Sequence, residues 1–361
     1  MAEHRVFDVS VRGDEEDARQ LLNDPTIAVL DTVDQQRRSL AELLPRPVTE
    51  LEEQARWVHY PWRRTVARVL GPDGFHRLRL DRNRDKITLD EQRTFRGLKI
   101  GVVGLSVGHA IAHTLALEGL CGELRLADFD ELDLSNLNRV PASVFDLGVN
   151  KSVLAARRIA EIDPYLPVVV FTDGITEASI DEFVDGLDLV IEECDSLEVK
   201  LLVREHARRR RIPVVMETSD GGVLDVERFD LDPDRPLLHG LLPDLGPARF
   251  SAMTAEEKTA VAASILDPAK ITARMAASVP QIGSTLSTWP QLGGDVALGG
   301  AAVAAAVRTF GRGESLPSGR RRIDLDALLR AGEDPLARQR DSAARAAVPS
   351  QSASGDDADT A

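Results

Sequence analysis

The stretch KIGVVGLSVGHAIAHTLALEG, residues 99–119, decides the fold. It begins with an apolar run of strand type, turns at GLSVG (residues 104–108) and continues with helical spacing until Gly119. This order of strand, glycine-containing turn and helix is typical of two kinds of site. One is the G-x-S-x-G nucleophile elbow of a hydrolase, in which Ser106 would attack an acyl group. The other is a loop that binds the phosphates of a nucleotide.

The residues that follow repeat the alternation of strand and helix signals. The predicted strands are LKIGVVGL (98–105), ELRLADFD (123–130), PVVVFTDG (167–174), LDLVIEEC (187–194) and IPVVMET (212–218). Helical segments separate them, which predicts right-handed βαβ units. We therefore expect an α/β, Rossmann-like fold with a mostly parallel sheet and flanking helices. Such sheets bind ligands at the carboxyl ends of their strands, so functional residues should follow the strands.

The sequence on either side of this core predicts three domains. Residues 1–78 show helical spacing at 14–24 and 33–44, and Pro61 predicts a further helix start, so we expect a small helical cap or docking domain. Residues 79–330 form the α/β domain, with an antiparallel strand at 222–231 and helices at 254–266, at 270–279 and near 300. Residues 331–361 are rich in Ala, Ser, Asp and Arg, which predicts a disordered tail.

Composition limits the possible functions. The net charge of −15 disfavours nucleic acids and anionic membranes as partners, because the field of an acidic protein repels both. Two cysteines, Cys121 and Cys194, exclude a disulfide framework and a four-thiolate zinc site. The N-terminus is charged without an apolar signal core, and the most apolar run, residues 296–307, is too short to span a membrane. We expect a cytoplasmic protein without zinc.

The residues after the second strand favour the nucleotide loop over the elbow. A hydrolase needs an acid and a histidine base downstream, and nothing local marks His206 or His239 as a base. A nucleotide loop needs an acidic residue roughly 20 positions on, at the end of the next strand, to bind the ribose. Asp128 and Asp130 stand at that place. An NAD-linked oxidoreductase would fit these residues as well.

A polar cluster beyond the acidic pair points to a triphosphate. DLSNLNR (133–139) follows Asp130 directly, and a redox enzyme has no evident need for it. Arg139 can neutralise phosphate with its planar fork, and Lys151, which opens the next helix, can add a point charge. Asp195 follows the fourth strand, where a carboxylate can hold Mg²⁺. Arg84 lies just upstream of the sheet.

Taken together, these segments resemble the ThiF/MoeB family, related to the ubiquitin-activating enzymes. The resemblance covers about residues 80–240 and rests on RNRD (82–85), VVGLSVG (102–108), ADFDELDLSNLNR (127–139), GVNK (148–151) and EECDS (192–196). It is closest to an actinobacterial branch in which a ThiF-like module precedes a nitroreductase-like flavin domain. A nitroreductase-like partner is therefore a further expectation.

The resemblance implies an ATP-dependent adenylation of a carboxylate to an acyl-adenylate, with Mg²⁺, in a homodimer. The carboxylate would belong to a peptide or ubiquitin-like protein C-terminus or to a small acid. The implied roles are ribose binding by Asp128, phosphate binding by Asn136, Arg139 and Lys151, Mg²⁺ binding by Asp195, and entry of Arg84 into the partner subunit's ATP site. Gly104, Ser106, Gly108 and Asp130 would complete the nucleotide site.

The chain departs from the family pattern in two ways that leave an alternative open. Ser106, Val107 and His109 stand near positions that the family gives to glycine, and Gly108 is offset. No cysteine follows Cys194, so a covalent thioester relay on the enzyme is not expected. The altered loop also fits a catalytically degenerate binding module that works with another enzyme.

Overall fold

The computed structural model describes residues 3–220, 222–242, 245–254, 257, 261 and 271–330. The chain divides into a unit of residues 1–322 and a second unit of residues 323–361. The second unit contributes one described helix, α14 (Leu325–Arg330). The predicted disordered tail, 331–361, and most of the predicted helix at 254–266 lie outside the described residues.

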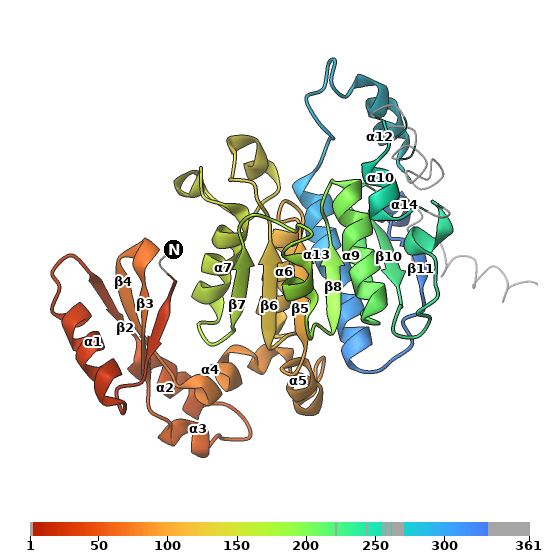
Figure 1. Ribbon diagram of the computed structural model, residues 1–361. Helices are drawn as coiled ribbons and strands as arrows, with labels where there is room; N and C mark the ends of the chain where they lie inside the picture. The colour runs from red at the N-terminus through yellow and green to blue at the C-terminus, as the bar shows by residue number, and fades with distance from the viewer. Residues whose placement is uncertain are drawn as a thin grey trace, which may run out of the picture. The chain divides into compact units, whose positions relative to one another are not determined.

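A seven-stranded sheet forms the centre of the larger unit, and its α/β, Rossmann-like architecture confirms the predicted fold class (Figure 1). The strands are β5 (Lys99–Val103), β6 (Glu123–Ala127), β7 (Val168–Phe171), β8 (Leu189–Glu192), β9 (Val214–Thr218), β10 (Val223–Glu227) and β11 (Gly319–Arg322). Their order in the sheet is β11-β10-β9-β8-β5-β6-β7. The first five strands are mutually parallel and coincide with the five predicted runs. β10 pairs antiparallel with β9, as predicted, and β11 adds an antiparallel edge.

Helices cover both faces of this sheet because its strands are apolar on both sides. One face carries α5 (Leu89–Phe95), α6 (Gly108–Glu118), α7 (Lys151–Ile162) and α13 (Gly293–Gly311). The other face carries α8 (Ile180–Val184), α9 (Leu197–Arg209), the short turn η5 (Leu237–Gly240) and α10 (Pro247–Ser251). The helix α12 (Ala273–Ser278) and the turn η6 (Val279–Gln281) precede α13.

The predicted helix near residue 300 is α13, and its small residues allow close packing. A Cβ on Gly300 would lie 3.2 Å from the carbonyl oxygen of Ala110 on α6. A Cβ on Gly299 would lie 2.3 Å from a carboxylate oxygen of Glu217 on β9. Neither α13 nor any other described helix is sufficiently long and apolar to cross a bilayer.

The prediction of a purely helical N-terminal domain is wrong, because residues 5–69 contain a four-stranded sheet of order β1-β3-β4-β2. Its strands are β1 (Arg5–Phe7), β2 (Ala28–Asp31), β3 (Arg56–Tyr60) and β4 (Thr65–Val69), and its helices are α1 (Arg12–Leu22), α2 (Val33–Ala41) and α3 (Thr49–Glu52). In β3, buried Val58 and Tyr60 alternate with the more exposed Trp57 and His59, which is the period of a strand. Pro61 opens only the 3₁₀ turn η1 (Pro61–Arg63) between β3 and β4.

This N-terminal sheet contacts the central domain through α7. The Tyr60 hydroxyl donates to the carbonyl oxygen of Ala160 at 3.2 Å, and Arg63 Nε lies 2.8 Å from a carboxylate oxygen of Glu161. The helix α4 (Pro72–Arg79) and the turn η2 (Asp81–Asn83) then lead to α5 and the central sheet. The N-terminal sheet and the central sheet therefore belong to the same unit of the chain.

Candidate active site

The order of the central sheet places a crevice beside β5. The chain runs from β5 outward to β6 and β7, then returns to the other side of β5 with β8 and β9. The connections after β5 and β8 therefore leave in opposite directions, and the carboxyl ends of these strands are where open α/β sheets bind ligands. The loop 104–108 follows β5, the acidic pair follows β6, and Asp195 follows β8.

Asp128 holds the glycine loop in place. Its Oδ2 accepts the backbone N–H of Leu105 at 2.6 Å, and its Oδ1 accepts that of Asp130 at 2.8 Å. The side chain is buried, and this burial raises the pKa of Asp128 although both hydrogen bonds act in the opposite direction. Asp128 therefore connects the loop after β5 to the segment after β6, which is the position predicted for it.

Gly104 is required by both its conformation and its surroundings. Its φ of +84° lies in the left-handed region, and a Cβ would be 2.7 Å from the backbone nitrogen of Cys194. Gly108 packs equally closely at the start of α6, where a Cβ would be 2.7 Å from Val102 Cγ1. The two glycines let the loop lie against the ends of β5 and β8.

We expect Gly104→Ala to lower the free energy of unfolding by about 3 kcal/mol or more, because backbone strain and a clash with backbone atoms add. Gly148→Ala is the matched control, since Gly148 has a φ of +77° but open space at its Cβ position. It should cost only about 1–2 kcal/mol. Urea unfolding of both variants measures the difference, and equal losses would contradict the close packing of the loop.

Arg139 reaches back over the glycine loop. Its Nη2 donates to the hydroxyl oxygen of Ser106 at 3.0 Å. Burial lowers the pKa of Arg139, and the nearby charge of Asp195 opposes that shift. The structure thus brings Ser106, Arg139 and Asp195 together, as the nucleotide interpretation predicts. Because the partner of Ser106 is a guanidinium and not a base, this geometry does not activate a serine nucleophile.

Lys151 stands at the first position of α7 with its ammonium group directed at the acidic pair. Its Nζ lies 2.8 Å from Asp130 Oδ2, and its side chain is 7% exposed. Asn150 caps this helix and donates to the carbonyl oxygen of Asp128 at 2.9 Å. Lys151, Asp130 and Asp128 therefore form one group at the ends of β6 and α7.

Asn136 has a different setting from the one expected. Its Oδ1 accepts the backbone N–H of Asp133 at 3.0 Å, within the capping box of the short turn η3 (Leu134–Asn138). His109, which stands near a glycine position of the family, is fully buried in α6, and burial followed by the charge of His113 lowers its pKa to about 3. The imidazole is therefore neutral and inside the protein.

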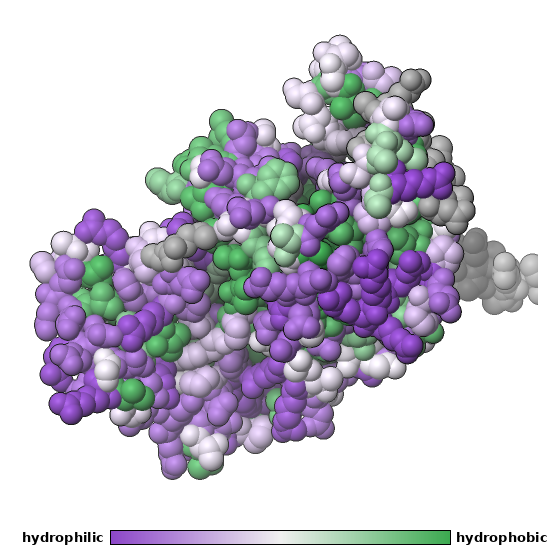
Figure 2. Space-filling view, in the orientation of Figure 1, coloured by the Kyte–Doolittle hydropathy of each residue, from purple (hydrophilic) through white to green (hydrophobic). Residues whose placement is uncertain are grey.

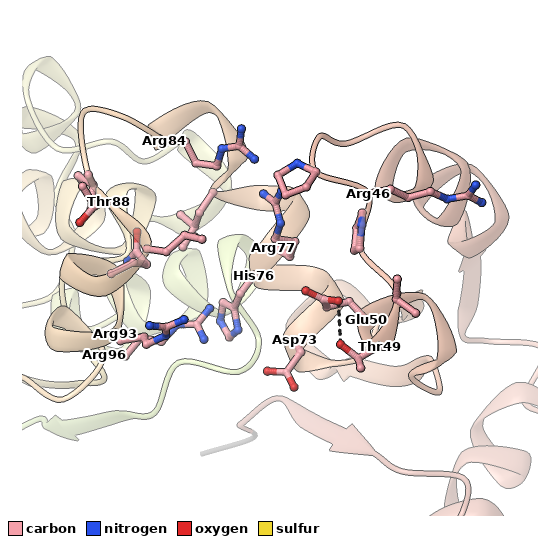
Figure 3. Close-up of a pocket in the computed structure, with 17 residues that line it drawn as sticks. Arg46, Thr49, Glu50, Asp73, His76, Arg77, Arg84, Thr88, Arg93 and Arg96 are labelled. Atoms are coloured by element: carbon pink, nitrogen blue, oxygen red, sulfur yellow. Dashed lines mark hydrogen bonds between the residues drawn. The ribbon is translucent and has the colours of Figure 1, made fainter.

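Arg84 lies in another pocket. It lines a cavity of about 430 Å³ between the 45–50 segment and helices α4 and α5, together with Arg46, Arg77, Arg93 and Arg96 (Figure 3). Its Nη1 donates to the carbonyl oxygen of Leu44 and lies 3.3 Å from a carboxylate oxygen of Asp81. Within one chain, Arg84 and Asp195 thus line different cavities, so a role of Arg84 in a partner's site stays a prediction.

A second cavity, of about 320 Å³, opens beside Asp195 and Arg139 at the ends of β8 and β9. Thr218 and Asp220, which follow the fifth predicted strand, also line it. Sequence reasoning missed two further lining residues, Glu193 and Glu217, which are 9% and 3% exposed.

Residues 80–284 match the ThiF family profile. The chain belongs to the ThiF family. The match begins just before η2 and ends just after η6, and it includes the glycine loop, the acidic pair, Arg139, Lys151 and Asp195.

Three relatives show how much of this chain aligns with other proteins. Uncharacterized protein MT1398 of Mycobacterium tuberculosis is 53% identical over 317 residues, which are 88% of this chain and 44% of that protein. The tRNA threonylcarbamoyladenosine dehydratase of Bacillus subtilis is 31% identical over 42% of this chain and 60% of its own length. The molybdopterin-synthase adenylyltransferase of Haemophilus influenzae is 25% identical over 43% and 64%. The chain therefore spans less than two thirds of each relative.

Solved structures of ThiF-like folds also align with the chain. The Escherichia coli tRNA N6-threonylcarbamoyladenosine dehydratase TcdA in complex with ATP aligns at a TM-score of 0.48 with 20% identity, over 66% of this chain and 95% of that one. MccB of Escherichia coli aligns at a TM-score of 0.45 with 15% identity, over 65% and 66%.

The ThiF domain contains a buried charge network that the sequence reasoning did not identify. Glu192 accepts from Lys200 at 3.0 Å and from Arg204 at 2.5 Å, and Arg204 also donates to Glu227 at 2.5 Å. Although burial acts in the opposite direction, Lys200 and Arg204 lower the pKa of Glu192 to about 2. Glu192 Oε1 also accepts the backbone N–H of Cys194 at 2.8 Å, so the network fixes the turn that leads to Asp195. The detectable signal was Lys and Arg inside the otherwise apolar face of α9.

Proposed function

We propose that the chain adenylates a carboxylate with Mg-ATP and releases pyrophosphate. The observation that carries the proposal is the contact of Arg139 with Ser106 above the glycine loop, with Asp195 beside it. A guanidinium, a carboxylate and a strand-end loop at one crevice are the parts needed to neutralise and orient a triphosphate. Family membership and the names of relatives such as the Haemophilus influenzae adenylyltransferase support the same reaction class.

The residues present fit ATP and a magnesium ion. Asp128 and the close-packed Gly104 form the ribose and phosphate end of the crevice, and Arg139 and Lys151 supply positive charge. Asp195 offers one carboxylate, which is sufficient for a metal that is otherwise held by phosphate oxygens and water. When bound, Mg²⁺ would neutralise phosphate charge. The protein residues would position the substrate carboxylate for attack on the α-phosphate, and no protein nucleophile is needed.

A thioester on the enzyme is not part of the proposal. Cys194 donates its thiol hydrogen to Glu192 Oε1 at 2.9 Å. Burial, reinforced by the charge of Glu192, raises the pKa of Cys194 well above its usual range. The thiol is therefore protonated and poorly nucleophilic. The acyl-adenylate would instead pass to an acceptor that enters from outside.

The proposal also includes a homodimer in which Arg84 serves the ATP site of the other copy. The placement of Arg84 supports this, since Arg84 and Asp195 line different cavities of the same chain. Exposed apolar side chains on the segment between β6 and α7 offer a surface for such an assembly (Figure 2). They are Phe129, Leu134, Val144 and Phe145, with exposed fractions of 60–89%.

Calorimetry with Mg-ATP tests the reaction class. We expect saturable binding by the wild type and at least about 100-fold weaker binding, or none, by Asp195→Ala and Lys151→Ala. Arg209→Ala is the control, because Arg209 lies in the last turn of α9, lines neither cavity and has a side chain that is 60% exposed. A folded wild type that does not bind ATP would overturn the proposal.

A partner-dependent binding module is the second candidate. It is favoured by the pairing already present in the structure, in which Arg139 contacts Ser106 and Lys151 contacts Asp130. In this case the loop would keep the fold while another enzyme, such as a nitroreductase-like flavoprotein, carries the chemistry. ATP binding that appears only after such a partner is added would select this candidate.

A further inference from the structure

Two buried carboxyl groups line the cavity, and one of them has no hydrogen-bond partner among the described residues. Glu193 directly follows β8, and Glu217 lies on the neighbouring strand β9. Both line the cavity next to Asp195. Glu193 Oε1 accepts the backbone N–H of Glu217 at 2.8 Å, so the two residues are directly joined. In the described part of the chain, neither carboxylate oxygen of Glu217 has a hydrogen-bond partner, although the residue is only 3% exposed. Burying a carboxyl group without donors is costly unless a proton or a ligand compensates it.

The cations near the pair are already engaged elsewhere. The described lining of the cavity includes Lys200 and Arg320, which pair with Glu192 at 3.0 Å and Asp225 at 3.0 Å, respectively. Glu192 and Asp225 are not among the described residues that line the cavity, so Lys200 and Arg320 each pair with an acid outside the cavity lining. Arg139 faces Asp195. Each of these cations therefore faces another acid, and Glu217, whose pKa burial raises to about 8, is ionised and without a paired cation only above that pH.

The walls around the pair fit an organic cation better than a metal ion. Val107, Leu197, Met216, Val223, Leu238 and Trp289 supply apolar surface. No group of three or more His, Cys, Asp or Glu side chains suited to a metal occurs among the residues that the structure describes. Mg²⁺ and Ca²⁺ prefer six or more oxygen ligands, whereas an ammonium group on an apolar stem needs only two or three acceptors.

We propose that Glu193 and Glu217 form the binding site of a primary amine, which attacks the acyl-adenylate so that the overall product is an amide. This proposal rests on the adenylation proposed above. It names the acceptor class for that reaction and assigns Glu217 the role of proton acceptor.

The reaction balances with these groups. The ammonium group first gives one proton to the Glu217 carboxylate, which exposes the nitrogen lone pair. The nitrogen then bonds to the acyl carbon, the bond from that carbon to the AMP oxygen breaks, and AMP leaves with the electron pair. The second nitrogen proton passes to solvent. Burial raises the pKa of Glu217 to about 8, so the transferred proton is stable on its carboxyl group.

Binding of n-butylamine tests the site without ATP. We expect one butylammonium ion to bind saturably by calorimetry at pH 8.5, and Glu217→Gln and Glu193→Gln each to weaken it at least tenfold. Glu182→Gln, an exposed change on α8, is the matched control. Two probes define specificity, n-butanol for the apolar stem and Mg²⁺ alone for a metal site. Equal binding of butanol, Mg²⁺ binding that both Gln variants weaken, or unchanged butylammonium binding by both Gln variants would overturn the proposal.

A second readout separates the amine site from adenylation. With a carboxylate that supports ATP–pyrophosphate exchange, Glu217→Gln should keep exchange within about threefold of wild type and lose at least tenfold in butylamide formation. Hydroxylamine is neutral at pH 7 and needs no proton acceptor, so its capture of the adenylate should be unchanged. Loss of exchange in Glu217→Gln would overturn the assigned role. Absence of exchange in the wild type would overturn the adenylation proposal, while the binding result would still decide the amine site.

Discussion

Arg204→Met is expected to lower the free energy of unfolding by about 3–5 kcal/mol. The guanidinium is completely buried and pairs with Glu192 and Glu227, whose side chains are 0% and 1% exposed. Together with Lys200 these four groups form a neutral cluster. Methionine fills similar space but leaves Glu227 without its cation, and an uncompensated buried carboxylate is far less stable than a paired one.

The measurement is urea unfolding of Arg204→Met beside Arg209→Met on the same helix. Arg209 is 60% exposed and pairs with Glu205 one turn away, so its loss should cost less than about 1 kcal/mol. Adding Glu227→Gln to Arg204→Met should restore part of the stability, because the double variant removes both charges. Equal midpoints for the two single variants would show that the buried network does not stabilise the fold.

The network also links stability to the site. Glu192 connects Arg204 to the backbone of Cys194, one residue before Asp195. Loss of Arg204 therefore removes a constraint on the turn that carries the proposed magnesium ligand. The buried carboxylate of Glu192 therefore contributes both to the stability of the fold and to the positioning of Asp195.

The central sheet could be predicted because its signals are local. Each parallel strand is an apolar, β-branched run, and Gly119 ends α6 in the left-handed conformation expected of a C-terminal glycine. The hairpin of β3 and β4 was missed because each strand is short, carries an arginine (Arg56 or Arg68), and is followed or preceded by the segment of Pro61, which resembles a helix start. The edge strand β11, with sequence GRRR, has no strand signal, and it forms by pairing with β10.

The residues of the candidate site also fall into those that local sequence could predict and those that depend on strand pairing. Asp128, Arg139, Lys151 and Asp195 lie in short polar segments after strands, where spacing alone indicates a ligand site, although their roles stay predictions. Glu193 and Glu217 were missed because one acidic residue at the end of an apolar run is an ordinary strand end. Only the pairing of β8 with β9 brings them together.

At pH 9, Glu217→Gln is expected to be more stable than the wild type by several kcal/mol, whereas at pH 5 the two proteins should be about equal. Burial, followed by the charge of Asp295 on α13, raises the pKa of Glu217 from 4.5 to about 8. Glu193 accepts the backbone N–H of Glu217, and the charge of Lys200 on α9 acts on Glu193. The folded protein therefore keeps a proton that the unfolded chain releases between these two pKa values.

The sign follows from this difference in bound protons. The contribution of Glu217 is fully present below pH 4.5 and is lost as the pH rises through about 8. At about 1.4 kcal/mol per pKa unit, the loss amounts to roughly 5 kcal/mol at most. Glutamine resembles the protonated form at every pH, so the stability of Glu217→Gln does not fall in this way as the pH rises.

Urea unfolding of wild type, Glu217→Gln and Glu182→Gln from pH 5 to pH 9 measures this pH-dependent loss of stability. A stability difference between wild type and Glu217→Gln that does not change with pH would mean that Glu217 is ionised or compensated in the folded chain. If butylammonium narrows the difference at pH 9, the same carboxylate that destabilises the empty cavity binds the amine.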